Sequence, residues 1–340
     1  MSVQLPLIDL SALAPDAVGR DAELARLRQA AREFGFFRLG GHGVPPALDE
    51  TLREQARQLF ALPDADKQAI AMRHSAQFRG YTRPGAELTR GRSDWREQID
   101  LGREEVALDP AALGAAGASA ALRLHGPNQW PRTLPHFRNA AQAWQLAMED
   151  VLLRVLEACA EALGQPRGVF RPLYRDQPWW TMKLIRYPGQ SGDDQGVGAH
   201  KDGELLSLIA QDQAGGLQVQ TADGDWIEAR PTPSCYVVNV GEQLELASDG
   251  YFKAAVHRVR SPAAGTERLS AAFFLGARLD SRIPALTLPP ALASEARGYT
   301  RDPANPLLHD VGANTLKGRL RSHPDVAEAH HADLIAMKAP

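Results

Sequence analysis

The stretch Gly198-Ala-His-Lys-Asp-Gly203 places an imidazole and a carboxylate two positions apart. The stretch is typical of a β-strand, in which successive side chains point to opposite faces, so His200 and Asp202 are expected to share a face. A second histidine, His257, lies 55 positions after Asp202 in the strand-like run Ala255-Val-His-Arg-Val259. If this second strand returns beside the first, the three side chains can bind one face of a metal ion.

Two imidazoles and one carboxylate, with the opposite coordination face left open, form the arrangement that holds non-haem Fe(II) for oxygen chemistry. The open positions admit a co-substrate and dioxygen. A His-x-Asp pair alone is weak support, because the chain repeats it at His331-Ala-Asp333. That copy lies in a polar, alanine-rich segment that is typical of a helix, where residues two apart do not share a face. We therefore interpret His331 and Asp333 as solvated helix residues.

Short strand-like runs separated by turn residues surround the candidate ligands. Pairs such as Pro188-Gly189, Gly215-Gly216 and Asp223-Gly224 are good turn formers. Several short strands at this spacing indicate a β-sandwich or barrel. The runs cover residues 181–187, 205–211, 217–221, 226–229, 236–240, 255–260 and 269–275.

The remaining sequence predicts helices and one irregular segment around this β-rich region. Apolar residues at helical spacing indicate helices over about residues 24–34, 46–60 and 135–163, and residues 36–39 read as a buried strand. Residues 77–109 are predicted to be irregular, and a long irregular segment in a compact enzyme is often a lid or a binding loop. After about residue 280 the chain is expected to become helical and charged again.

The composition narrows the possible partners and compartment. Lys and Arg total 38 and Asp and Glu total 41, and the resulting net charge of −3 is spread along the chain without a basic block for nucleic acid or an anionic membrane. Cys159 and Cys235 are far apart in apolar runs, so we predict buried thiols in a reducing compartment. The N-terminus has no signal-length apolar run, and residues 111–122 are too weakly apolar to cross a bilayer. We expect a soluble cytoplasmic protein.

A second cluster of candidate site residues follows His257 by 11 positions, at Arg268-Leu-Ser270. On a strand, Arg268 and Ser270 share a face, and an arginine can bind a carboxylate through two parallel hydrogen bonds while a serine donates a third. Tyr187 could donate its hydroxyl to the same carboxylate. The three residues are therefore a candidate clamp for a dicarboxylic co-substrate. The alternative is that Arg268 forms a surface ion pair and that Tyr187 covers the rim of the barrel.

At this point the chain resembles a known family, the 2-oxoglutarate- and Fe(II)-dependent dioxygenases of the isopenicillin N synthase-like type, from about Leu5 to Leu279. The segment Glu33-Phe-Gly-Phe-Phe-Arg-Leu-Gly-Gly-His-Gly-Val44 is similar to the family's Asp-x-Gly-Phe-Phe and His-Gly-Val elements. Further similar elements are Phe78-Arg-Gly-Tyr81, Gly215-Gly-Leu-Gln-Val219, Val237-Val-Asn-Val-Gly241 and His257-Arg-Val259.

The resemblance implies a mainly β fold with flanking helices (α+β), built on a double-stranded β-helix, or jelly-roll, core. It implies that His200, Asp202 and His257 hold Fe(II), and that Arg268, Ser270 and Tyr187 hold the distal carboxylate of 2-oxoglutarate. We expect one catalytic unit over residues 1–340. Its parts are a helical and mixed N-terminal part with the lid segment (1–178), the jelly-roll core with the iron site (179–280) and a helical C-terminal extension (281–340).

Two positions depart from the family pattern. Ile185 stands where many plant members carry the asparagine of Asn-x-Tyr, and Glu242 replaces the usual aspartate after Asn-x-Gly. Isopenicillin N synthase is also similar to this pattern, yet it uses no 2-oxoglutarate, and its Arg-x-Ser pair binds substrate. The clamp alone therefore leaves the co-substrate open.

The implied activity is the oxidation, by default the hydroxylation, of a small organic molecule with 2-oxoglutarate and O2, releasing succinate and CO2. Arg79, Tyr81, Trp95 and Arg96 are the candidate wall of the substrate pocket. One alternative is an oxidase, a cyclase or an ethylene-forming enzyme of the same fold, and another is a non-catalytic metabolite-binding protein. The sequence does not indicate the substrate, the position oxidised, the pathway or the oligomeric state.

Overall fold

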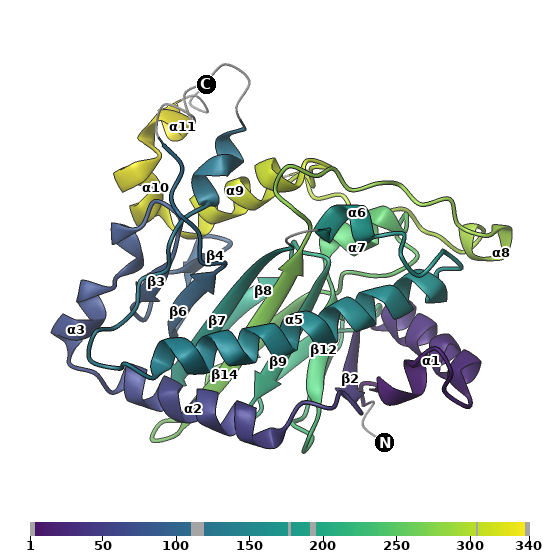
Figure 1. Ribbon diagram of the computed structural model, residues 1–340, viewed down its shortest axis with the longest axis horizontal. Helices are drawn as coiled ribbons and strands as arrows, with labels where there is room; N and C mark the ends of the chain where they lie inside the picture. Colours follow the sequence, from purple (N-terminus) through teal and green to yellow (C-terminus); the bar gives the residue numbers. More distant parts are fainter. Residues whose placement is uncertain (1–3, 110–118, 176–177, 191–194, 304, 337–340) are drawn as a thin grey trace.

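The computed structural model describes residues 4–109, 119–175, 178–190, 195–303 and 305–336. Two β-sheets form its centre, and helices cover the outer face of the larger sheet (Figure 1). The side chains between the sheets come from both of them, including Ile185 and Val237 of the larger sheet and Val197 and Val219 of the smaller sheet. Part of the space between the two sheets therefore has an apolar lining.

The larger sheet contains eight strands among the described residues, and all neighbouring pairs except β1 and β2 are antiparallel. In sheet order they are β1 (Leu7–Asp9), β2 (Phe36–Gly40), β12 (Tyr236–Val240), β9 (Leu206–Gln211), β14 (Glu267–Gly276), β7 (Trp179–Pro188), β6 (Glu97–Gly102) and β3 (Gly80–Thr82).

The smaller sheet is antiparallel and ends on the strand that carries His200. Its order is β11 (Trp226–Glu228), β10 (Leu217–Gln220), β13 (His257–Arg260) and β8 (Gln195–His200). A separate two-stranded hairpin joins β4 (Leu88–Thr89) and β5 (Arg92–Ser93). Because β8 is an edge strand, one side of its backbone has no strand partner.

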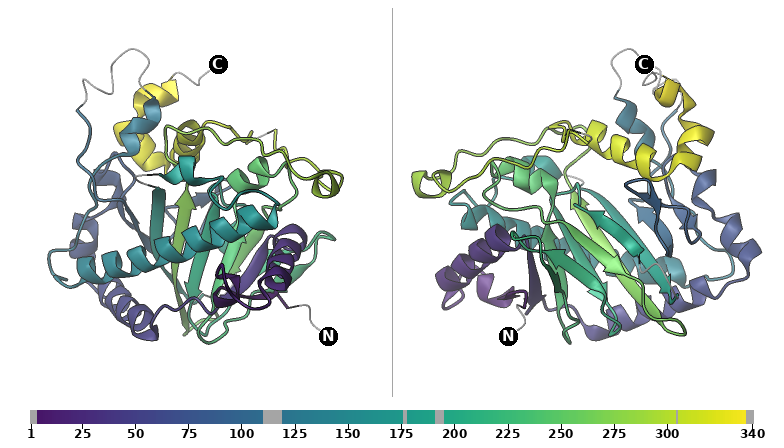
Figure 2. Two further views of the ribbon diagram at one scale, coloured as in Figure 1. Left: turned by 45° about the vertical axis from the view of Figure 1, so that its right-hand side comes forward. Right: turned by 180° about the vertical axis from the view of Figure 1, so that it is seen from behind.

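The long helix α5 (Phe137–Ala162) packs on the outer face of the larger sheet with α1 (Arg20–Glu33) and α2 (Pro46–Phe60). In α5, Trp144, Met148, Val151, Val155 and Cys159 recur every three or four residues and are fully buried, which gives the helix one apolar face. Figure 1 shows α5 and α2 in front of the sheets, and the reverse view of Figure 2 shows them behind.

Shorter helices connect the strands or cover the ends of the sheets. They are α3 (Asp64–Ala69), α6 (Arg171–Tyr174), α7 (Glu242–Ala247), α8 (Pro290–Ala293), α9 (Val311–Ser322), α10 (Pro324–His330) and α11 (Ala332–Ala336). Single 3-10 turns lie at Ser11–Leu13, Met72–His74 and Ala120–Leu124. Within the described part of the chain, no helix has the length and apolar character that a membrane span requires.

Most predicted elements are present, and the seven strand-like runs between residues 181 and 275 each match a strand whose ends differ by two residues or fewer. Three predictions are wrong in part. Residues 77–109 contain β3 and β6, which extend the larger sheet, besides the β4–β5 hairpin. Residues 281–310 carry little helix apart from α8. The strand predicted through Asp202 ends at His200, so Asp202 lies in the segment that follows it.

Candidate metal centre

His200, Asp202 and His257 converge at one end of the space between the sheets. His200 is the last residue of β8, His257 is the first residue of β13, and the two are paired in the strand register. One ligand atom from each of the three side chains lies within 4.8 Å of the other two. The Nε2 atoms of His200 and His257 are 3.5 and 3.6 Å from the same oxygen of Asp202, Oδ1. The three donors therefore surround a common point.

The backbone fixes which nitrogen of each imidazole faces this point. The Nδ1 atom of His200 lies 2.8 Å from the carbonyl oxygen of Gly198, and the Nδ1 atom of His257 lies 3.2 Å from that of Ala255. A carbonyl oxygen can only accept a hydrogen bond, so Nδ1 carries a proton in both rings and Nε2 is the nitrogen left to bind a metal. Such a bond to the other ring nitrogen is the usual support of a metal-binding histidine.

The charges of the group also suit a divalent cation. Burial lowers the pKa of His257 to about 4, so its imidazole is neutral at neutral pH. Burial acts to raise the pKa of Asp202, but the neighbouring imidazoles of His257 and His200 outweigh burial and hold that pKa below its ordinary value. Two imidazole nitrogens and one carboxylate oxygen are the donor set of a facial Fe(II) site, and these residues fit it.

Asn239 supports the carboxylate of this group, a contact that the sequence analysis did not predict. Its Nδ2 atom donates a hydrogen bond of 2.8 Å to Oδ2 of Asp202, and Asn239 is 1 % exposed. This bond engages one carboxylate oxygen and leaves Oδ1 directed at the two imidazoles. The available signal was an asparagine in the otherwise apolar strand Tyr236-Val-Val-Asn-Val240.

Replacing Asn239 by alanine is expected to weaken metal binding by about 10- to 100-fold, the usual effect of removing a group that orients a ligand. Isothermal titration calorimetry with Fe(II) under anaerobic conditions measures the change. Asn139→Ala, at an exposed position of α5, is the matched control. An unchanged affinity for Fe(II) would show that Asn239 only packs the strand.

Arg268, Ser270 and Tyr187 form a second cluster on the inward face of the larger sheet. Arg268 is paired with Tyr187 across β14 and β7, and its guanidinium lies 4.8 Å from the centre of the Tyr187 ring. The guanidinium donates to the carbonyl oxygen of Gly215 at 2.7 Å and to Oγ of Ser270 at 3.0 Å. A longer bond of 3.4 Å reaches Oε1 of Gln211, a residue that the sequence analysis missed.

The charge of Arg268 has no carboxylate partner among the described residues. Arg268 is 1 % exposed, and its hydrogen-bond acceptors are neutral. A buried guanidinium is stabilised far more by a carboxylate than by neutral acceptors. The cluster therefore fits a ligand that brings a carboxylate to Arg268.

The four predicted wall residues of the substrate pocket do not lie together. Arg96 is buried beside Glu87 and Asp94, and Arg79 is 1 % exposed. Tyr81 packs in the core on the α5 side of the sheet, where its hydroxyl donates to a carboxylate oxygen of Glu97 at 2.6 Å. Trp95 is 40 % exposed. The structure thus brings Arg96 near the metal group but turns Tyr81 to the opposite face.

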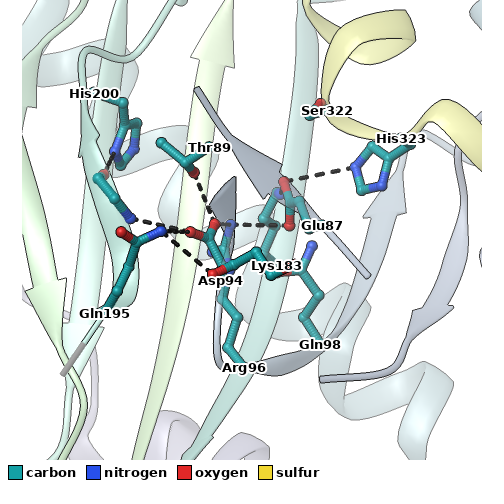
Figure 3. A network of polar contacts seen from close by, with 12 residues as sticks. Glu87, Thr89, Asp94, Arg96, Gln98, Lys183, Gln195, His200, Ser322 and His323 are labelled. Carbon is teal, nitrogen blue, oxygen red and sulfur yellow. Dashed lines mark hydrogen bonds and ion pairs between the residues drawn. The ribbon is translucent and has the colours of Figure 1, made fainter. Parts of the chain in front are cut away.

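Asp94 joins the segment around β4 and β5 to the strand of His200 (Figure 3). One oxygen of the fully buried Asp94 accepts from the backbone N–H of Gly198 at 3.0 Å, two residues before His200. The other oxygen accepts from Oγ1 of Thr89 at 2.8 Å and from Arg96 at 3.2 Å. The backbone N–H of Trp95 also donates to β8, at Gln195, over 3.1 Å. Residues 94 and 95 therefore cover the open edge of β8.

The second His-x-Asp pair lies apart from this site, but the prediction that it is solvated is wrong for His331. His331 is 1 % exposed, stacks on Phe78 with ring centres 5.2 Å apart and bonds to the carbonyl oxygen of Ala76. Asp333 is exposed and pairs with Arg123. Of the predicted buried thiols, Cys159 is buried and Cys235 is only partly buried.

Comparisons with known proteins agree with this geometry. Residues 5–133 match a family model described as the N-terminal region of a non-haem dioxygenase in morphine synthesis, and residues 179–277 match the 2OG-Fe(II) oxygenase superfamily. The chain is 35% identical over 342 residues to the 2-oxoglutarate-dependent dioxygenase frbJ of Dothideomycetidae sp. (strain 11243), covering 95% of this chain and 91% of that protein.

Two further relatives cover most of the chain. The homoarginine-6-hydroxylase 2-ODD-C23.1 of Arabidopsis thaliana is 34% identical over 301 residues, which are 84% of this chain and 88% of that protein. The solved structure of the rice dioxygenase for auxin oxidation has a TM-score of 0.66 and 29% identity, covering 93% of this chain and 95% of that one.

The two facing sheets and the matched regions define a 2-oxoglutarate- and Fe(II)-dependent oxygenase with a double-stranded β-helix core. The chain belongs to this family, and it is an oxidoreductase that uses Fe(II), 2-oxoglutarate and O2. The predicted family, fold class and cofactors are thereby confirmed, and the alternative of a non-catalytic binding protein has no support.

Proposed function

We propose that His200, Asp202 and His257 hold Fe(II), and that the enzyme hydroxylates a small organic molecule while 2-oxoglutarate is converted to succinate and CO2. The observation that carries this proposal is the convergence of two Nε2 atoms and one carboxylate oxygen within 4.8 Å. The bound iron, with 2-oxoglutarate and O2, supplies the oxidising chemistry that inserts oxygen into a C–H bond.

The protein residues have separate tasks in this reaction. Asp202 supplies the negative charge that balances the cation, and Asn239 holds its second oxygen. Arg268 and Ser270 receive the distal carboxylate of 2-oxoglutarate, so that its keto-acid end reaches the metal group. Tyr187 lines the same end with its ring against Arg268. Apolar residues between the sheets, including Ile185 and Val219, exclude water around the co-substrate.

The whole of residues 1–340 acts in this proposal as one catalytic unit. The metal ligands come from residues 179–280, whereas Arg96 comes from the N-terminal part. The substrate is a small molecule, and the relatives include proteins named for hydroxylation of homoarginine.

The proposal predicts an optical signal in the absence of substrate. Anaerobic addition of Fe(II) and 2-oxoglutarate is expected to give a visible charge-transfer absorbance, because the keto-acid chelates the metal. Zn(II) in place of Fe(II) is the control and should give no band, since it has no redox chemistry. Admission of O2 should then remove the band and release succinate. A protein that binds Fe(II) but shows neither band nor succinate would contradict the proposed function.

A further inference from the structure

A group of buried charged side chains, here called the charged ring, lies beside the metal centre on the inward face of the larger sheet. Lys183 of β7 contacts Glu87 at 2.9 Å and Asp100 of β6 at 3.4 Å. Arg319 of α9 donates to the same oxygen of Asp100 at 2.8 Å, and Arg96 pairs with Glu87 at 2.9 Å. The charged ring comprises Glu87, Asp94, Arg96, Asp100, Lys183 and Arg319.

The strand register and the bonds of Asp94 place this ring at the metal group. Lys183 points inward with Ile185 and Tyr187, because residues two apart on a strand share a face. Asp94 bonds to β8 beside His200, as Figure 3 shows. The His200 side chain is 32% exposed, against 6% for Asp202 and 5% for His257, so the metal group opens on the side of His200.

Each carboxylate of the ring contacts at least two donors. Glu87 is paired with Lys183 and Arg96, and Asp94 accepts four hydrogen bonds from four residues. Asp100 accepts hydrogen bonds from Gln98 and Arg319 and forms an ion pair with Lys183 at 3.4 Å. Unpaired hydrogen-bonding atoms of both kinds remain, because Nε of Arg96 and Oε2 of Glu87 are both buried without a hydrogen-bond partner. An acceptor oxygen of a ligand would satisfy the unpaired N–H of Arg96.

Arg79 adds a buried cation to the same face. Its Nε and Nη2 atoms are buried without hydrogen-bond partners, and Arg79 forms no ion pair with the described residues, although the charges of Asp100, Glu105 and Glu104 act on it. The guanidinium lies against Gly102 and over the Trp179 ring at 5.2 Å. Burial and the charge of Arg319 lower the pKa of Arg79 to about 9. Arg79 therefore remains a cation at neutral pH and favours a nearby anion.

Arg319 and Lys183 are the members of the ring best placed to bind that anion. Both converge on Oδ2 of Asp100, and both keep a little exposure, 14% and 11% of their side chains. Arg319 also bonds to Oγ1 of Thr181, which is paired across the sheet with Gly102, so Arg79 and Arg319 occupy neighbouring positions. Arg319 and Lys183 thus converge on one carboxylate oxygen with Arg79 close by, and such a group of cations is suited to bind a carboxylate.

We propose that the substrate of this dioxygenase is an organic acid, and that Arg319 and Lys183 bind its carboxylate. On binding, the substrate carboxylate would take over part of the contacts that Arg319 and Lys183 now make with Asp100. The unpaired positive charge of Arg79 would favour the bound anion. This inference rests on the proposed function, because it assigns the substrate of the same site.

The test uses the Fe(II)- and 2-oxoglutarate-loaded enzyme with small carboxylic acids, each paired with its primary amide: indole-3-acetate, phenylacetate and L-arginine. At least one acid is expected to stimulate succinate release and to raise the Tm of the protein, whereas its amide does neither. In Arg319→Gln the KM for that acid should rise by at least about 10-fold, since a charge-assisted bond is lost. Arg319→Lys retains the charge and should restore part of the affinity.

Arg321→Gln, at an exposed position two residues further along α9, is the matched control and should leave the KM unchanged. Equal stimulation by acids and amides, or by no acid in the set, would overturn the proposal. A lower Tm in Arg319→Gln with an unchanged KM would assign the charged ring to stability alone. The visible band with 2-oxoglutarate should persist in all variants, and its absence from the unmodified enzyme would refute the proposed function instead.

Discussion

Replacing Asp202 by alanine is expected to abolish turnover, with succinate formation falling by more than about 100-fold, because even the loss of a group that orients a ligand costs 10- to 100-fold. Asp202 is the one anionic member of the metal group, and both imidazoles face its Oδ1 atom. Without it, Asn239 would also lose the acceptor of its hydrogen bond. Succinate release and anaerobic Fe(II) titration measure the two effects.

The control for this variant is Asp223→Ala, which removes an exposed carboxylate in the turn before β11. Circular dichroism should show that the Asp202 variant keeps the fold, since the carboxylate lies after the end of β8 and not within a strand. Full turnover and full Fe(II) affinity in Asp202→Ala would remove this residue from the metal site.

Replacing Arg268 by glutamine is expected to raise the KM for 2-oxoglutarate by about 10- to 100-fold, because a buried carboxylate would lose its charged partner. The remaining contacts of Ser270 and Gln211 are neutral and cannot replace the charge. The measurement is the rate of succinate release against 2-oxoglutarate concentration. Arg230→Gln, at an exposed position, serves as the control.

The same variant distinguishes two roles of the Arg-x-Ser pair. If Arg268 binds 2-oxoglutarate, the KM for 2-oxoglutarate rises and the KM for the substrate changes little. A selective rise in the KM for the substrate would instead assign Arg268 to substrate binding, as in isopenicillin N synthase.

The metal group could be predicted from sequence because its information is local. His200 and Asp202 are two residues apart, and His257 lies on a strand whose apolar alternation is clear. Arg268 and Ser270 are also two residues apart, and they lie within β14, where alternate side chains share a face. Asp202 lies after the end of β8, so that alternation does not apply to it. Alternation does not reveal Asp94 or Arg319, which reach the site from a hairpin and from a C-terminal helix. Their positions depend on how distant segments pack, and one sequence contains no direct signal for that packing.

Two errors have related physical causes. Residues 77–109 were predicted as irregular because prolines and glycines interrupt charged and aromatic positions, yet they contain β6, whose Gln98 and Asp100 are fully buried on the inward face. His331 was predicted to be solvated because the surrounding segment is polar. Instead, His331 directly follows the end of α10, and the His331 ring packs on Phe78. In both cases a polar residue is buried beside a specific partner, whereas composition alone favours exposure.

The cover that Asp94 and Trp95 place over β8 has a consequence for redesign of this enzyme. The same short segment carries Glu87 and Arg96 of the charged ring and supplies the hydrogen bond to Gly198. An exchange of this segment for that of a relative, made to alter substrate range, would also uncover the strand that holds His200. Substrate range and metal binding therefore depend on the same segment. A transplanted segment must keep a hydrogen-bond acceptor at the position of Asp94.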